Sequence, residues 1–304
     1  MSAATGRGRA IVFVALASTA FSVSSPIARY ARPAHPLFVA FGRVALASLV
    51  LFALDIAGVL RHLREMTAAT RWRILICGAI LGIHFALFQA GLDATSIPAA
   101  VSLVSLEPLG VIVAALIFFG EVPSRREQIG VVLATIGAAV VAFAAGTGEH
   151  KLVGDLLVLG SVALFGFYVA AARAIRNALP PQHAGSMIYA TAALVILFVL
   201  PFAGALENIA ELPKRSFLAI TGIALIPTIV GHTSVQAAAR TLPPAIVSLV
   251  SPGETLGGLL IAAVFLHEIP KPQECVGAAL ILSGVLFAIF GPASAVRDVA
   301  NENE

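Results

Sequence analysis

Two glutamates stand in the middle of long apolar stretches, within two segments of the chain that resemble each other. Glu107 belongs to SLVSLEPLGVIVAALIFFGE and Glu254 to SLVSPGETLGGLLIAAVFLHE. A charge at the centre of a membrane helix costs about 2.5–3.5 kcal/mol on insertion scales, so something must offset it. Three roles remain open: a protonated and hydrogen-bonded structural group, a partner for the ammonium group of a bound solute, or a group that takes up and releases protons.

Arg43 is the cation that the second apolar stretch carries, eight residues from its start. Its long side chain can extend outward to the membrane surface. Otherwise it pairs with Glu107, or its planar guanidinium holds the carboxylate of a solute.

Further polar and aromatic side chains stand at helical spacing. His84 and Phe88 are four residues apart, as are His232 and Gln236, so each pair shares one helix face. We also expect Gln89, Phe165, Tyr168 and Ser251 to line a shared cavity, where the aromatic rings would favour an aromatic solute. The alternative is packing and hydrogen bonding between helices, and we expect no metal site because ligand spacing is lacking.

Four prolines interrupt apolar stretches and are candidate hinges. A proline frees a backbone carbonyl and allows a helix to bend. Simple kinks are the alternative. The four are Pro26, Pro108, Pro227 and Pro252.

The elements that must position these residues are membrane-spanning helices. Hydrophobic residues make up 59% of the 304 residues and charged residues 12%, about half the charged fraction of a soluble domain. Crossing a bilayer takes roughly 20 apolar residues, and lipid leaves an unpaired backbone no partner, so we expect helices. Nucleic acid is excluded as a partner because the basic residues are scattered between the apolar stretches. The expected spans are 10–30, 36–54, 73–92, 97–119, 127–145, 153–172, 184–204, 216–238, 243–266 and 274–291.

The positive residues predict the orientation of the spans. If the N-terminus is cytoplasmic, twelve Lys and Arg residues fall in cytoplasmic segments and six in exterior ones. This bias favours both termini inside. We expect the first span to be retained rather than cleaved, and 292–304 to be a disordered cytoplasmic tail.

The two similar segments predict a duplicated fold. Glu107 and Glu254 are 147 positions apart, as are Gly130 and Gly277. The halves, 1–148 and 149–291, would then hold five helices each. Because five is odd, the halves cross the membrane in opposite directions, which makes an inverted repeat around a central cavity.

The chain resembles the EamA-type ten-helix members of the drug/metabolite transporter superfamily. The likeness rests on Arg43, on Gly231-His232-Thr233, on the glycine pairs Gly130/Gly137 and Gly277/Gly284, and on two proline-containing spans ending in Glu121 and Glu268. The order Ser251-Pro252-Gly253-Glu254-Thr255 departs from the usual Gly-Glu-Pro. Within the superfamily the chain is most similar to the YddG-type aromatic amino-acid exporters.

The resemblance implies a secondary transporter without cofactors in a bacterial-type cytoplasmic (inner) membrane. Its partners would be the lipid bilayer, a small metabolite such as an amino acid, and possible coupling protons. Export of other metabolites or cationic drugs is the main alternative. A membrane-embedded enzyme is a remote one, because Glu121 and Glu268 each stand alone and are expected to cap helices or pair with Arg125 and Lys271.

Overall fold

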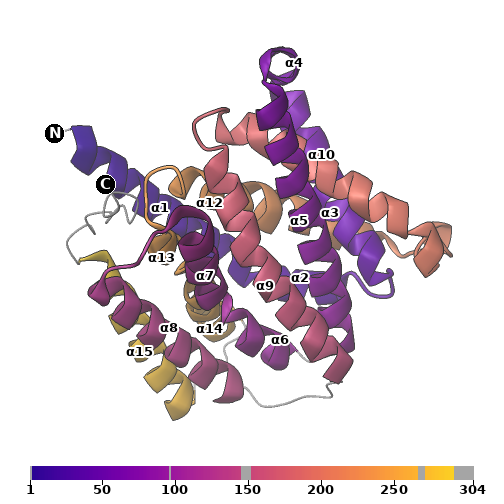
Figure 1. Ribbon diagram of the computed structural model, residues 1–304. Helices are drawn as coiled ribbons and strands as arrows, with labels where there is room; N and C mark the ends of the chain where they lie inside the picture. The colour runs from indigo at the N-terminus through magenta and orange to yellow at the C-terminus, as the bar shows by residue number, and fades with distance from the viewer. Residues whose placement is uncertain (1, 96, 145–151, 266–270, 291–304) are drawn as a thin grey trace.

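A computed structural model describes residues 2–95, 97–144, 152–265 and 271–290, and every regular element within these ranges is a helix (Figure 1). The first half of the chain contains α1 (Ser2–Ser22), α2 (Ser24–Tyr30), α3 (Pro36–Leu54), α4 (Ile56–Glu65), α5 (Ala68–Ala94), α6 (Ile97–Val104), α7 (Glu107–Phe119) and α8 (Arg125–Ala144). The expected tail 292–304 and the expected boundary at 148/149 lie outside the described residues.

The second half contains α9 (Leu152–Ala174), α10 (Pro181–Val199), the 3-10 turns η1 (Pro201–Ala203) and η2 (Ile209–Glu211), α11 (Lys214–Ile223), the π-helix η3 (Ala224–His232), α12 (Thr233–Ala238), α13 (Pro244–Val247), α14 (Val250–Phe265) and α15 (Pro272–Ile289). Within the described ranges, seven helical segments are long and apolar enough to cross a membrane. The all-helical membrane architecture is therefore confirmed, whereas the count of ten spans stays a prediction.

Several expected spans are divided into shorter helices. The stretch 97–119 breaks at Ser105-Leu106 between α6 and α7, and 243–266 breaks between α13 and α14. Pro108 and Pro252 lie in the first turns of α7 and α14, where a proline costs no helical hydrogen bond. The chain therefore turns just before these prolines and not at them.

Pro227 lies inside a helical segment, whereas Pro26 lies in a first turn, as Pro108 and Pro252 do. Pro26 is in α2, which follows a break at Val23. Pro227 is in η3, the π-helical part of the stretch 216–238. A proline removes one backbone donor, and π-helical turns occur frequently at functional sites.

Glycines bring α8 and α15 into backbone contact. A Cβ atom added to Gly130 would be 2.6 Å from the carbonyl oxygen of Gly284, and one added to Gly137 would be 2.6 Å from that of Gly277. Figure 1 shows these two helices side by side. Gly130 corresponds to Gly277 and Gly137 to Gly284 in the sequence repeat, so the contact is reciprocal, as a two-fold axis requires.

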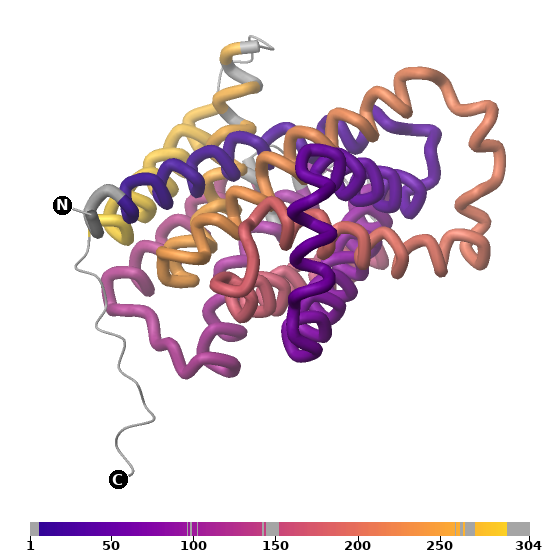
Figure 2. Tube along the Cα trace, turned by 90° about the horizontal axis from the view of Figure 1, so that it is seen from above, coloured from indigo at the N-terminus to yellow at the C-terminus, as the bar shows by residue number. Residues whose placement is uncertain are grey.

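Other helix contacts come in corresponding pairs. The helix α7 packs on α9, and α14 packs on α1, which Figure 2 shows running beside the C-terminal helices. Likewise α5 packs on α9, while α1 packs on η3 and α12. An inverted repeat would produce this pattern, and it remains the proposal that the contacts support.

We predict that Gly137→Ala destabilises the protein and that Gly258→Ala does not. A methyl group at Gly137 meets backbone atoms of α15, whereas in the described part of the chain nothing lies within 4 Å of a Cβ atom at Gly258. Overpacking of this kind costs about 1–3 kcal/mol, while alanine is the better helix former at an open position. Thermal unfolding of both variants in detergent measures the difference, and equal midpoints would contradict the packing role of Gly137.

Candidate functional site

Seven of the predicted binding residues line one cavity in the middle of the bundle. This central cavity has a volume of about 30 Å³, which is room for little more than a water molecule. Its wall comes from both halves of the chain. The predicted residues in the wall are Arg43, His84, Phe88, Glu107, Phe165, His232 and Glu254, and the others are Phe21, Ser24, Phe85 and Val104.

Arg43 on α3 is buried, with 2% of its surface exposed. Its Nε donates a hydrogen bond to Oγ1 of Thr228 in η3 at 3.0 Å. Its guanidinium carbon lies 3.9 Å from the centroid of the Phe85 ring, the geometry of a cation–π interaction. Extension of Arg43 to the membrane surface is therefore excluded, and its hydrogen-bond partner is Thr228 instead of Glu107.

Glu107 is the first residue of α7 and is buried. Its carboxylate accepts a hydrogen bond from Oγ of Ser251 on α14. The start of a helix carries a partial positive charge from its free backbone amides, which favours a carboxylate there. The break before α7 therefore creates a suitable place for an acidic group inside the bundle.

Glu254 enters the same cavity from α14. Its backbone carbonyl accepts a hydrogen bond from Oγ of Ser22 at 3.0 Å, which ties this part of α14 to α1. The central cavity thus brings one guanidinium and two carboxyl groups together. Such a set matches the ammonium and carboxylate groups of a zwitterion.

Aromatic rings surround these charges. Nδ1 of His84 donates to the carbonyl oxygen of Ser161 at 2.9 Å, because a carbonyl can only accept, and this leaves Nε2 for another partner. The His84 and Phe88 rings are parallel to within 10°. The ring centroid of His232 lies 4.7 Å from that of Phe21.

Tyr168 and Gln236 lie beside the central cavity. Nε2 of Gln236 donates to the Tyr168 hydroxyl at 3.0 Å, and the Tyr168 and His232 ring centroids are 5.7 Å apart. Oε1 of Gln236 and Nδ1 of His232 are buried without a hydrogen-bond partner in the described part of the chain. Buried polar atoms are normally paired, so Oε1 of Gln236 can accept a bond from a solute or from water, and Nδ1 of His232 can accept or donate one depending on its tautomer.

Gln89 lies elsewhere. It lines a separate cavity of about 10 Å³ with Arg29 and Asp93, so the expectation that Gln89 shares a cavity with Gln236 is wrong. The two glutamines are equivalent in the sequence repeat. An axis lying in the membrane plane would put them on opposite sides of the central cavity.

Phe21 and Phe85 are cavity residues that sequence reasoning missed. The repeat could have revealed them, because Phe21 and Tyr168, like Phe85 and His232, are 147 positions apart. Each phenylalanine is therefore the equivalent of a residue that was identified. Thr228, the partner of Arg43, is not equivalent in the repeat to any residue that the sequence analysis identified.

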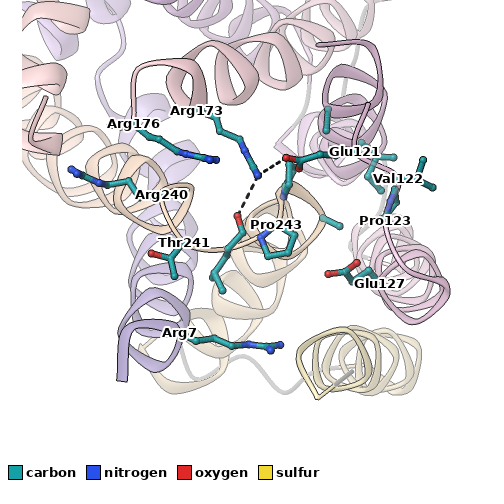
Figure 3. A pocket seen from close by; sticks show the side chains of 15 residues that line it. Arg7, Glu121, Val122, Pro123, Glu127, Arg173, Arg176, Arg240, Thr241 and Pro243 are labelled. Carbon is teal, nitrogen blue, oxygen red and sulfur yellow. Dashed lines mark hydrogen bonds and ion pairs between the residues drawn. The ribbon is translucent and has the colours of Figure 1, made fainter. Parts of the chain in front are cut away.

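The two ends of the bundle differ. At one end a cavity of about 310 Å³, which we call the vestibule, lies among Arg7, Glu121, Arg173, Arg176 and Arg240 (Figure 3). Nη2 of Arg173 is 2.5 Å from Oε1 of Glu121, so Glu121 pairs with Arg173 and the expected pairing with Arg125 is wrong. Glu268 lies outside the described residues.

Arginines tie α2 to the end of α5 on the opposite side of the central cavity. Nη2 of Arg32 lies 2.7 Å from Oδ1 of Asp93. Nη2 of Arg29 donates to the carbonyl oxygens of Leu92 and Thr95 at 2.6 and 2.7 Å. The cavity on this side is the small one that contains Gln89.

Comparison with solved structures shows that this helical arrangement is known. One crystal structure of a protein aligns with a TM-score of 0.75 at 18% identity, covering 92% of this chain and 98% of the other. At this identity the likeness concerns the fold alone.

Comparison with known sequences adds the family. A protein of Streptantibioticus cattleyicolor named as a probable terminal-alkyne amino-acid exporter is 27% identical over 256 residues, which is 82% of each chain. The EamA-like transporter family matches this chain twice, over residues 8–143 and 152–290. The two matches cover nearly the whole sequence and confirm the resemblance noted from its motifs. The chain therefore belongs to the EamA-like transporter family, within the drug/metabolite transporter superfamily.

Proposed function

We propose that this transporter exports small amphiphilic metabolites, most of all amino acids and among them aromatic ones. The observation that carries the proposal is the composition of the central cavity, where Arg43, Glu107 and Glu254 face the same space as the aromatic rings. The name of the Streptantibioticus cattleyicolor protein supports an amino-acid substrate.

Each part of an aromatic amino acid finds a matching group in the wall of this cavity, which would have to widen to admit the whole solute. Arg43 has two terminal guanidinium nitrogens that hold no partner among the described residues, and these suit a carboxylate. Glu107 and Glu254 suit the ammonium group. Phe85, Phe88 and Phe165 give the side chain apolar and stacking surfaces.

Movement of the two halves against each other would expose this site to either side of the membrane in turn. The double family match and the reciprocal contact of α8 with α15 support two halves related by an axis in the membrane plane. Two halves related in this way can adopt two equivalent packings. Breaks beside Pro108 and Pro252, and the π-helix around Pro227, are where we propose that the helices bend.

The described conformation fits one stage of such a cycle. The Arg29 and Arg32 contacts close one side, while the vestibule leaves the other side hollow. With the N-terminus cytoplasmic, as the positive residues favour, the vestibule faces the cytoplasm. A solute that is to be exported would arrive there.

We predict that the purified protein in liposomes exchanges labelled phenylalanine, tyrosine and tryptophan for the unlabelled amino acid. Counterflow measures this exchange without any other energy source. Threonine and a cationic drug in the same panel test the breadth of the cavity. Exchange of the drug together with no exchange of any amino acid would contradict the proposed substrate class and leave the family assignment intact.

We further predict that Glu107→Gln and Glu254→Gln each lower phenylalanine counterflow at least tenfold. An amide is neutral, and a charge-assisted hydrogen bond is worth about 1.5–3 kcal/mol. Glu65→Gln is the matched control, because Glu65 is exposed at the end of α4.

A pH gradient imposed without a substrate gradient separates ammonium binding from proton coupling. Full counterflow in both glutamine variants, with loss of accumulation driven by the pH gradient, would contradict ammonium binding. That result would assign the carboxyl groups to proton coupling.

A further inference from the structure

The vestibule gathers more positive than negative charge. Two adjoining cavities, of about 310 and 500 Å³, share Glu121, Arg173 and Arg176 in their walls. The other arginines around them are Arg7, Arg73 and Arg240, and the second acidic residue is Glu127. Among the described residues that line these cavities, five arginines against two glutamates leave an excess of positive charge around a space large enough for a small organic solute.

Most of these arginines are held by the protein. Arg173 is bound by Glu121 and by the carbonyl oxygen of Leu242. Nη1 of Arg240 donates to the carbonyl oxygen of Leu179 at 3.3 Å, and Nη2 of Arg7 donates to that of Ile289 at 2.9 Å.

Arg176 differs from them. In the described part of the chain its guanidinium has no hydrogen-bond or ion-pair partner, and Figure 3 shows it extending toward Arg173 inside the cavity. Among the described residues, the carboxylate beside the two arginines is that of Glu121, which Arg173 already engages. Two neighbouring guanidinium groups with one counter-charge attract a further anion.

Apart from Thr241, the uncharged residues of the vestibule wall are apolar. They are Ile112, Ala115, Val122, Pro123, Leu242, Pro243, Pro244 and Ala245. A wall of this kind suits a solute that carries an apolar group next to its anionic group. The combination matches an amphiphilic carboxylate better than an inorganic anion.

Three helical segments each place one residue in the wall of the vestibule and another, eight positions away, in the wall of the central cavity. Phe165 and Arg173 on α9 are eight residues apart, as are His232 and Arg240 around α12. Glu107 and Ala115 on α7 repeat this spacing. Eight residues of α-helix span about 12 Å, which is a short distance for a solute to move from the vestibule to the central cavity.

The hydrogen-bonded pair of Tyr168 and Gln236 occupies the interval between the two cavities. Tyr168 lies between Phe165 and Arg173 on α9, and Gln236 lies midway between His232 and Arg240.

We propose that the vestibule is a first binding site for the carboxylate group of the transported solute, with Arg176 as its specificity-determining residue. The inference rests on the proposed function and adds a selection step before the central cavity. A solute with a carboxylate is concentrated at this end of the bundle, while a solute that carries only an amine is not.

The test compares Arg176→Gln with wild type in proteoliposomes. Labelled phenylalanine is the substrate, and 3-phenylpropionate, which lacks the ammonium group, and phenethylamine, which lacks the carboxylate, are competitors. Arg64→Gln is the matched control, since it removes an exposed arginine of α4 that lines neither cavity. Arg176→Lys keeps the charge but loses the planar fork.

We expect Arg176→Gln to raise the KM for phenylalanine about tenfold while leaving kcat near the wild-type value. Competition by 3-phenylpropionate weakens by a similar factor, and competition by phenethylamine does not change. The dependence of KM on salt becomes flatter in this variant. The KM of Arg176→Lys lies between those of wild type and Arg176→Gln. Arg64→Gln behaves as wild type.

Three results would overturn the assignment, and each has a distinct meaning. Equal effects of Arg176→Gln and Arg64→Gln on KM would show that these arginines act only through the general surface charge. A difference that appears only in vesicles with anionic lipid would assign Arg176 to a lipid headgroup. A wild-type protein that exchanges no amino acid would overturn the proposed function itself.

Discussion

The burial of the Arg43 guanidinium inside a membrane protein is the constraint on which the rest of the site depends. A cation in the middle of an apolar bundle is costly unless hydrogen bonds and neighbouring groups compensate for it. Arg43 draws on Thr228 of η3 and on the face of Phe85 of α5. Because Thr228 comes from the second half and Phe85 from the first, this one charge ties the two halves together at the central cavity.

The irregular backbone follows from the same constraint. Thr228 also donates to the carbonyl oxygen of Ile223 at 2.9 Å, within the widened turns that contain Pro227. The break before α7 places Glu107 at a helix start, where backbone amides favour a carboxylate. Irregular backbone in a membrane is tolerated where it is surrounded by protein or lines a cavity. The same irregular positions are the places where the helices can bend.

The sequence alone predicted most of the site because polar residues in membrane helices seldom face lipid. Arg43, Glu107 and Glu254 stood out as charges in apolar stretches, and the structure brings them to one cavity. Gln89 was expected in the central cavity because it lies 147 positions from Gln236 in the sequence repeat, but it lines a different cavity. Equivalent residues of an inverted repeat would meet only close to the axis, and equivalence in sequence does not give the distance from that axis.

Long-range pairing and helix breaks were beyond the sequence for physical reasons. Glu121 was expected to pair with nearby Arg125, but the folded chain brings Arg173 to it from 52 positions away. The stretch 97–119 is apolar apart from Ser102, Ser105 and Glu107 and has the length of one continuous span, so its composition does not reveal the break at Ser105-Leu106. Pro108 predicted a bend at its own position. The break lies before it, and Pro108 belongs to the first turn of α7.

The central claim is that Arg43 binds the carboxylate of an amphiphilic amino acid in the central cavity. Equilibrium binding to the purified protein in detergent tests it through a double-mutant cycle. The cycle combines Arg43→Gln with the change of ligand from phenylalanine to phenethylamine. The account predicts that either change alone weakens binding at least tenfold and that the two together weaken it little further. Losses that multiply would contradict a direct contact between Arg43 and the carboxylate.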